Sequence, residues 1–376
     1  MGASPSFWEQ ESWLNGIDIA IIGGGIVGLS SAIHARERFP TARIVILERA
    51  PFPDGASNRN AGFACIGSIS ELLDDLSTQP MHKVMDTLTM RWEGLLRLRE
   101  LIGDQSLSYE AYGGFEVFLP EDKERYGKCQ EALPTFNHEI EKRLGEPEVF
   151  QLQDSAGSSK DFARVSKMIY NRLEGQIHTG KMMRAYWAKA IEMGIEFWGG
   201  VEVEEIVQLA EGVQINSKYG EWKVSKLILA TNGFSQQFLK HIDLQPARNQ
   251  VLITKPIPSL KWKGTFHYNK GYGYFRNVGN RVLIGGFRHL YKEEESTAEY
   301  ALHDHLQDHL QSWLKKNILG QTTFEVESRW SGILGVGKGK NPILEKKSDD
   351  LVLALRLGGM GVAIGTAVGK QAAALI

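Results

Sequence analysis

The chain has 376 residues, more than a single compact core usually holds and enough for two domains. Hydrophobic residues make up 42% and charged residues 23%, which is ordinary for a soluble globular protein. Lysine and arginine (43) nearly balance aspartate and glutamate (45), so neither nucleic acid nor an anionic membrane is expected as a main partner.

The cysteines and the N-terminal segment bear on the compartment of the protein. Cys65 and Cys129 give no disulfide framework, and a cytosolic setting is the simpler interpretation. Residues 1–15 lack a basic region followed by an apolar run, so no signal peptide is expected. No apolar run reaches the ~20 residues of a membrane helix. We therefore expect a cytoplasmic protein without a membrane span, and the sequence leaves its oligomeric state open.

The first structural signal is a buried strand, a glycine turn and a helix. The apolar run 17–22 is followed by Gly23, Gly25 and Gly28 in the pattern G-x-G-x-x-G. These glycines allow a tight turn, close approach of a pyrophosphate, and close packing of helix on strand. The helix is predicted over 26–38, and the free N–H groups of its first turn, at Ile26 and Val27, would face the phosphates.

A second strand, 43–47, ends at Glu48. This acid lies about twenty residues after Gly28, where a carboxylate hydrogen-bonds the ribose hydroxyls of a dinucleotide. A carboxylate would repel a 2′-phosphate, so NADP is disfavoured. The acid does not distinguish NAD from FAD.

The next loop carries a family resemblance. Residues 49–63 are punctuated by Pro and Gly, and 55–62 read Gly-Ala-Ser-x-x-Asn-Ala-Gly. An acid at a strand end followed by this pattern resembles the FAD-dependent amine and amino-acid oxidoreductases of the D-amino-acid oxidase and glycine oxidase (DAO) type. Without the preceding acid, a capped turn before a helix would explain the loop equally well. The resemblance implies that the loop contacts the phosphates and ribityl chain of FAD through Arg49, Ser57, Asn60, Ala61 and Gly62.

The middle of the chain alternates helices and strands. Apolar spacing predicts helices over 72–101, 121–143 and 181–193, and strands over 113–119, 195–198, 201–206 and 226–233, whereas 151–161 is expected to be a loop. The resemblance implies that Val203 contacts the adenine through its backbone. The strand end Ala-Thr-Asn-Gly, with Thr231 and Gly233, is similar to the family's Ala-x-Gly element beside the first glycine turn.

From about residue 246 the pattern changes to strands. Segments 250–254, 271–276 and 281–286, with a turn at 279–280, predict an antiparallel sheet, and a helix is expected over 297–319. Tyr272, Tyr274 and Arg276 alternate along one strand and should point the same way. The resemblance makes Tyr272 a substrate-side tyrosine. Arg276 is the first choice for a carboxylate contact, and an arginine at the rim of the sheet is the alternative.

The C-terminal part returns to the cofactor. It carries the family's Trp-x-Gly element and a strand, 351–355, followed by a glycine turn that opens a final helix. Such a turn would favour negative charge on the N1–C2=O edge of a reduced flavin. The chain departs from glycine oxidases in having no arginine just after the Trp-x-Gly element. Either Arg276, Arg329 or Arg59 replaces that arginine, or the substrate is not a simple amino acid. The cofactor contacts implied here are Gly332, Gly359, Met360, Gly361 and Val362.

Together these features predict an α/β fold. A discontinuous Rossmann-like FAD-binding domain (13–80, 160–245, 326–376) is expected beside a mostly antiparallel β substrate domain (81–159, 246–325). Sarcosine oxidases attach their flavin covalently to a cysteine in the C-terminal part, and neither Cys65 nor Cys129 lies there, so the resemblance implies non-covalent FAD. No metal site is predicted. The expected activity is oxidation of a C–N bond of a small amine or amino acid by hydride transfer to flavin N5. A flavin-dependent 2-hydroxy-acid dehydrogenase and a catalytically silent FAD-binding module are the alternatives.

Overall fold

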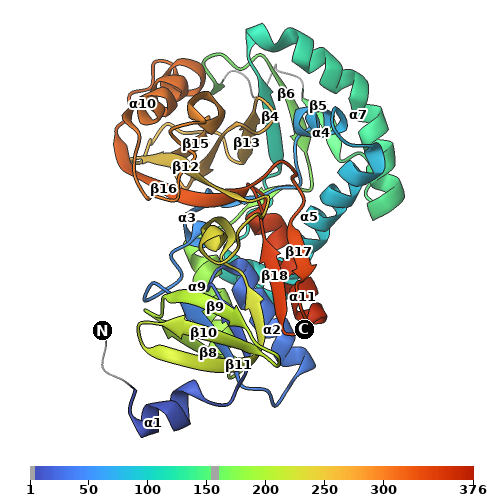
Figure 1. The fold of residues 1–376 in the computed structure, drawn as a ribbon. Coiled ribbons are helices and arrows are strands. Elements are labelled where there is room, and N and C mark those ends of the chain that lie inside the picture. Colours follow the sequence, from blue (N-terminus) through green and yellow to red (C-terminus); the bar gives the residue numbers. More distant parts are fainter. Residues whose placement is uncertain (1–4, 154–160) are drawn as a thin grey trace.

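Two large sheets form the two halves of the molecule (Figure 1). The structure, a computed structural model, describes residues 5–153 and 161–376. Each large sheet has eight strands, and a small third sheet pairs β3 with β7. The helices are α1 Phe7–Glu9, α2 Ile26–Arg38, α3 Ala56–Arg59, α4 Ile69–Leu76, α5 Met81–Ile102, α6 Asp104–Leu107, α7 Lys123–Leu144, α9 Thr179–Glu192, α10 Asp304–Trp313 and α11 Gly361–Leu375, with short 3-10 or π segments at η1 Gln10–Leu14, η2 Pro120–Asp122, η4 Asn232–Gln237, η5 Arg288–Tyr291 and η6 Leu314–Leu319.

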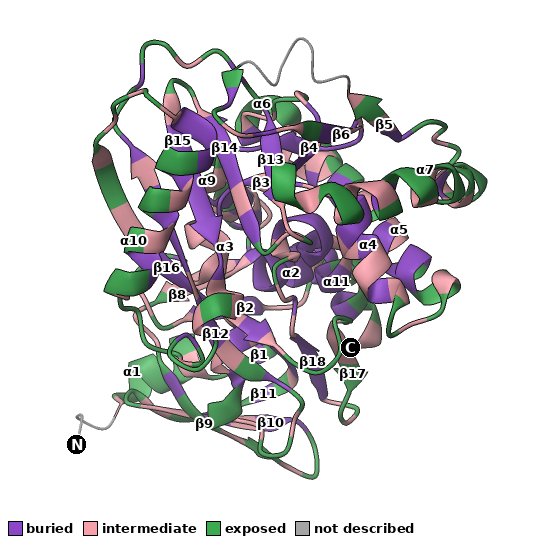
Figure 2. Ribbon diagram, turned by 90° about the horizontal axis from the view of Figure 1, so that it is seen from above, coloured by how far each residue is buried: buried purple, intermediate pink, exposed green. Residues whose placement is uncertain are grey.

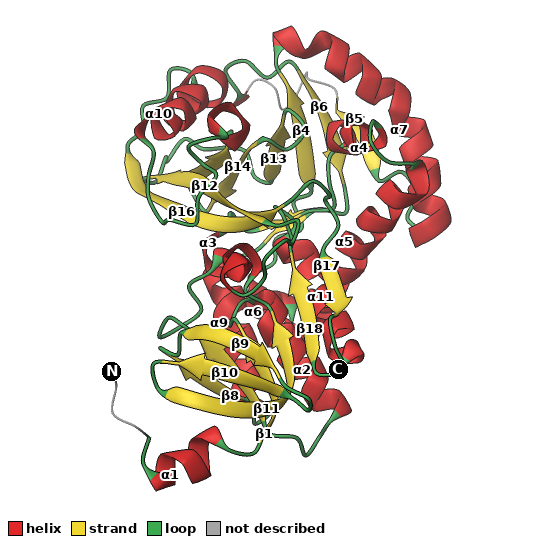
Figure 3. Ribbon diagram, viewed as in Figure 1, coloured by secondary structure: helices red, strands yellow, loops and turns green. Residues whose placement is uncertain are grey.

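The first large sheet has the order β17-β18-β11-β1-β2-β8, and it is parallel from β18 to β8. Helices α2, α5, α9 and α11 pack on one face (Figure 3). An antiparallel ribbon of β9, β10 and the long β11 covers the other face. Neighbouring residues of β1 therefore pack on different layers: Ile21 packs on the helices, and Ala20 and Ile22 pack on the ribbon. The strands are β1 Ile17–Ile22, β2 Ile44–Glu48, β8 Glu196–Gly199, β9 Val203–Gln208, β10 Val213–Ser217, β11 Gly220–Leu229, β17 Ile343–Lys346 and β18 Leu351–Leu355.

The second large sheet has the order β16-β12-β15-β14-β13-β4-β6-β5 and is antiparallel except where β13 meets β4. Its strands β13, β14 and β15 are mostly buried (Figure 2). Helix α10 packs on the outer face, and the opposite face meets Ala61 and Phe63 of the loop after β2. The remaining strands are β3 Phe63–Ala64, β4 Gly114–Phe118, β5 Phe150–Gln153, β6 Lys167–Asn171, β7 Gly175–Gln176, β12 Gln245–Thr254, β13 Thr265–Tyr268, β14 Gly273–Val278, β15 Arg281–Gly286 and β16 Val326–Val336.

The α/β fold class is confirmed, and several element boundaries are corrected. The helix expected over 72–101 is divided into α4 and α5 at Pro80, since the residue before a proline is disfavoured in a helix. The helix expected over 297–319 begins only at Asp304. Part of the loop expected over 151–161 belongs to β5, and residues 154–160 lie outside the described part of the chain.

The two expected domains interleave more than the sequence indicates. Strands β6 and β16 belong to the second large sheet, although the expected boundaries place both with the cofactor-binding segments. Strand β18 and helix α11 lie with the first sheet, and so does α5, which the expected boundaries place in the substrate domain. No helix among the described residues is both long and apolar enough to cross a bilayer.

Replacing Gly28 with alanine should destabilise the fold. A Cβ at Gly28 would lie 1.8 Å from the carbonyl oxygen of Gly23, so α2 could not approach β1 as it does. We expect Gly28→Ala to lower the free energy of unfolding in urea by about 1–3 kcal/mol, the usual cost of overpacking.

The matched control is Gly127→Ala, inside α7, where a Cβ would meet nothing within 4 Å. This change should raise stability by about 0.5–1 kcal/mol, because alanine is the better helix former. Equal effects of the two substitutions would contradict the assigned packing.

Candidate cofactor and substrate site

A cavity of about 790 Å³, partly open to solvent, lies where β1, β2 and β11 end. Parallel sheets bind ligands in such crevices, outside the carboxyl ends of their strands. The walls come from the glycine turn after β1, the loop after β2, the start of β9 and the turn after β11. The lining residues are Ile22, Gly23, Gly25, Leu47, Glu48, Arg49, Asp54, Gly55, Ala56, Ser57, Val201, Glu202, Val203, Ala230, Thr231, Asn232, Gly233, Phe234, Gln237, Phe238 and Ile333.

The glycine turn leaves backbone exposed to the cavity at the start of α2. Gly23 has φ of +106°, a conformation that glycine adopts without strain. Gly25 precedes the first residue of α2, and the N–H of Ile26 donates to Ser57 Oγ at 3.0 Å. A Cβ at Gly25 would lie 2.8 Å from the same oxygen. Ser57 thereby fixes the loop after β2 against a helix N-terminus, which favours an anion.

Glu48 is fixed at the end of β2 with its carboxylate on the cavity. Its Oε2 accepts the N–H of Gly24 at 2.8 Å, and its Oε1 accepts the N–H of Ala50 at 3.2 Å. Burial raises the pKa of Glu48, and these two N–H donors oppose the shift. A carboxylate oxygen has more than one lone pair, so the side chain keeps acceptor capacity for a hydroxyl pair.

Eight of the expected cofactor contacts line this cavity: Gly23, Gly25, Glu48, Arg49, Ser57, Val203, Thr231 and Gly233. Sequence reasoning did not single out Asp54, Ala56, Glu202, Asn232, Phe234, Gln237 or Phe238. In the turn after β11, the sequence motif pointed only to Thr231 and Gly233. The other missed residues lie on connections whose side chains follow no pattern.

The other expected contacts lie outside this cavity. Gly28 packs against Gly23, and Ile26 and Val27 belong to the buried first turn of α2. The Asn60 amide holds the loop itself, since its Oδ1 accepts the N–H of Gly62 at 2.8 Å and the hydroxyl of Thr179 at 3.0 Å.

The remaining expected contacts lie farther along the chain. Ala61 packs against Val251 and Leu283 of the second sheet, and a Cβ at Gly332 would approach Arg59 at 3.2 Å. The C-terminal glycine turn contributes Gly359 and Met360 just before α11, and a Cβ at Gly359 would meet nothing within 4 Å. Gly361 and Val362 are the first two residues of α11 itself.

These features fit a dinucleotide such as FAD. The glycine cradle and the α2 N-terminus suit the phosphates, and Glu48 suits the ribose. The loop 56–62 then leads from the cavity to the face of the second sheet that packs on Ala61 and Phe63. The turn before α11 lies near the segment after this loop, because Arg91 donates hydrogen bonds to both Met360 Sδ and the carbonyl oxygen of Ile66.

On that face of the second sheet, Tyr274 and Arg276 lie together and Tyr272 lies apart. The Tyr274 ring makes an edge contact with Phe63, with centroids 5.3 Å apart, and its hydroxyl accepts a hydrogen bond from Asn249 Nδ2 at 2.9 Å. Burial raises the pKa of Tyr274. Tyr272 precedes β14, is 43% exposed and stacks on His289 with centroids 4.3 Å apart.

Arg276 is buried beneath the loop after β2. Its Nη1 donates to the carbonyl oxygen of Gly62 at 3.2 Å. Its Nε is buried and has no hydrogen-bond partner among the described residues. Burial lowers the pKa of Arg276 to about 10, although Glu110 opposes the shift. The rim position considered from the sequence is therefore excluded, because only 6% of the residue is exposed.

A buried polar cluster beside this site was missed by sequence reasoning. Ligand atoms of Cys65, Glu174 and His267 lie within 4.8 Å of one another, a spacing at which a metal ion is conceivable. Both oxygens of Glu174 already accept hydrogen bonds, from two backbone N–H groups and from His267. Burial also raises the pKa of the Cys65 thiol well above its usual range. The geometry thus favours an internal hydrogen-bonded unit over a metal centre, which requires a thiolate.

Comparison with known proteins gives a consistent result. The model of a family described as FAD dependent oxidoreductase (DAO) matches residues 18–375. The chain is similar to the bifunctional protein ThiO/ThiG of Trichormus variabilis, with 22% identity over 65% of this chain and 36% of that protein. The chain thus spans about a third of the length of that relative.

Two solved structures are similar in fold. Glycine oxidase from Geobacillus kaustophilus gives a TM-score of 0.76 at 19% identity, covering 95% of this chain and 94% of the other. L-proline dehydrogenase from P. horikoshii also gives 0.76, at 17% identity, covering 95% and 92%.

Removing the Glu48 carboxylate should weaken FAD binding. Glu48→Ala deletes the proposed ribose contact and the acceptor of the Gly24 N–H, and hydrogen bonds of a charged group contribute about 1.5–3 kcal/mol. We expect the dissociation constant of FAD to rise about ten-fold or more, measured by titrating apoprotein with FAD and following flavin fluorescence.

Glu131→Ala is the control, since Glu131 is exposed on α7. It should leave FAD affinity unchanged. An unchanged affinity in Glu48→Ala would contradict the ribose assignment.

Proposed function

The chain belongs to the DAO family of FAD-dependent oxidoreductases, and we propose that it oxidises a C–N bond of a small amine or amino acid. FAD, when bound, supplies the hydride acceptor, flavin N5. The names glycine oxidase and L-proline dehydrogenase of two structurally similar proteins support a substrate with nitrogen on the reacting carbon.

The observation that carries the proposal is the contact of Tyr274 with Phe63. Phe63 directly follows the loop expected to run along FAD, and Tyr274 lies on the sheet face opposite it. A substrate that reaches the cofactor from the second sheet would therefore approach Tyr274. Asn249 fixes the Tyr274 hydroxyl, so this side chain offers one oriented polar atom in an otherwise apolar patch of Val251, Leu283 and Trp330.

The proposal assigns Arg276 to a carboxylate on the substrate. A buried guanidinium gains most from an anion when its pKa is lowered and its Nε has no partner, as holds for Arg276 within the described part of the chain. The chain carries no arginine after its Trp-x-Gly element, so Arg276 would replace that residue in function. The substrate nitrogen must be uncharged for hydride to leave the neighbouring carbon, and buried surroundings favour the neutral form.

The direct test is an absorbance experiment. Purified holoenzyme is mixed anaerobically with separate pools of amines, amino acids and 2-hydroxy acids, and the flavin band near ~450 nm is followed. Bleaching by amines or amino acids is expected, and recovery in air would identify an oxidase. Bleaching only by hydroxy acids, or by no pool, would contradict the proposal.

Substitution of Arg276 should separate amino acids from simple amines. In Arg276→Met we expect KM for an amino acid to rise about 100-fold, the loss of roughly 3 kcal/mol for a charged hydrogen-bonded pair. The KM of the corresponding decarboxylated amine should rise much less, because the amine lacks the anion and is affected only by the lost contact of Arg276 with Gly62.

Arg281→Met is the matched control, since Arg281 is on the adjacent strand β15 and forms an exposed ion pair with Glu327. Its kinetics should match wild type. Equal effects of Arg276→Met on both substrates would exclude a carboxylate contact.

A further inference from the structure

Residues 63–68 connect the loop after β2 (residues 49–62, here called the cofactor loop) to α4. This short segment has few backbone contacts of its own. Strand β3 consists of Phe63 and Ala64 and pairs with the two residues of β7. Residues 65–68 then continue without regular structure to α4. Phe63 packs edge-on against both Tyr274 and His267, each with a centroid separation of 5.3 Å. The position of this segment therefore sets the position of a ring that borders the proposed substrate site.

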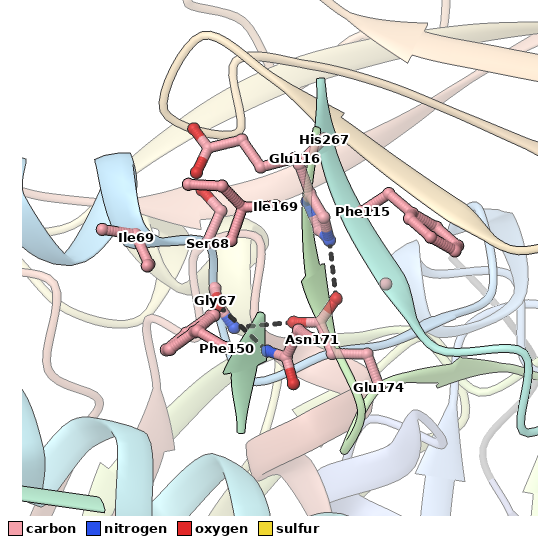
Figure 4. Close-up of a pocket in the computed structure, with 11 residues that line it drawn as sticks. Gly67, Ser68, Ile69, Phe115, Glu116, Phe150, Ile169, Asn171, Glu174 and His267 are labelled. Carbon is pink, nitrogen blue, oxygen red and sulfur yellow. Dashed lines mark hydrogen bonds and ion pairs between the residues drawn. The ribbon is translucent and has the colours of Figure 1, made fainter. Parts of the chain in front are cut away.

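One carboxylate joins this segment to the second sheet. Glu174 lies in the turn between β6 and β7, with 1% of its surface exposed. Its Oε1 accepts the N–H groups of Ile66 and Gly67, both at 3.0 Å. Its Oε2 lies 2.9 Å from Nε2 of His267 on β13 (Figure 4). A small pocket lies beside the pair and is lined by both side chains (Figure 4).

The surroundings of His267 favour its charged form. Burial alone lowers the pKa of His267, but nearby carboxylates outweigh it, and the pKa is raised above the usual value. The carboxylates come from three elements: Glu174 before β7, Glu71 on α4 and Glu116 on β4. Glu71 is itself paired with Arg91 of α5 at 2.6 Å, and Cys65 lies near both groups.

We propose that Glu174 and His267 are positioning residues of the active site: they hold residues 63–67 against the face of the second sheet that carries Tyr274. The pair acts through Phe63 and the backbone of Ile66 and Gly67, and it need not touch substrate. The inference rests on the proposed function for the role of Tyr274, but its consequences appear in FAD binding, which needs no substrate.

Removing the carboxylate should impair cofactor binding. Glu174→Ala leaves two backbone N–H groups and a buried imidazolium without their acceptor. We expect FAD to bind apoprotein about ten-fold or more weakly, with a shifted flavin absorbance band in the bound state. His267→Gln retains an N–H donor for Glu174 and should bind FAD within about three-fold of wild type at pH 6.5.

The pH dependence distinguishes positioning by an ion pair from simple packing. Because the pKa of His267 is raised in the folded protein, the ion pair contributes fully below about pH 6.5 and is lost as pH rises through the raised value. FAD affinity of wild type should therefore fall as the pH is increased above 6.5. His267→Gln, which does not titrate, should lack this component.

The control is Glu295→Gln, which alters another buried ion pair, with Arg248 of β12 at 2.9 Å. This variant should lower the melting temperature and leave both FAD affinity and its pH dependence unchanged. The proposal is overturned if Glu174→Ala binds FAD as wild type does, or if His267→Gln keeps the wild-type pH dependence. Should Glu174→Ala fail to fold, the comparison of His267→Gln with wild type decides. A wild type that binds FAD but oxidises no amine would contradict the proposed function and leave these binding results intact.

Discussion

The connection between β2 and α4 is held by both large sheets at once, and the candidate site depends on this double attachment. Near the first sheet, Ser57 Oγ accepts the N–H of Ile26 at the start of α2. Near the second, Arg276 donates to the carbonyl oxygen of Gly62, and Glu174 accepts the amides of Ile66 and Gly67. An irregular segment acquires a single position because each turn of its backbone has a side-chain partner.

The chemistry of the second sheet follows from its two faces. The face toward α10 is an apolar and aromatic core, with Phe266 and Phe275 stacked 4.8 Å apart. The face toward the cofactor loop carries buried polar groups, among them Glu116, His267 and Arg276. Buried charges persist only with partners, and breaking such a pair costs about 3–5 kcal/mol. Because these groups lie beside the cofactor loop, the region around that loop is polar although it is buried from solvent.

The sequence predicted local features well and long-range contacts poorly. The glycines after β1 and the acid ending β2 follow from local backbone demands, so the crevice at the carboxyl ends of these strands could be predicted from the sequence. Alternation along β14 correctly grouped Tyr274 with Arg276. The same alternation did not place Tyr272 correctly, because β14 begins at Gly273 and Tyr272 lies just before it. Nothing local marks Glu174 or His267 as partners, since they are far apart in the chain and meet only when β6 and β13 join one sheet.

Arg276 couples the two halves of the site through a single backbone group. A Cβ at Gly62 would lie 2.9 Å from Arg276 Nη2 and 2.5 Å from the carbonyl oxygen of Ile177, and Gly62 has φ of +74°. Glycine is thus needed there both for its conformation and for the approach of the guanidinium. A substrate anion drawn to Arg276 would act on a group that already holds the residue before Phe63. Under the proposed assignment of Arg276, substrate binding and placement of the cofactor loop would not be independent, since both would use the same buried cation.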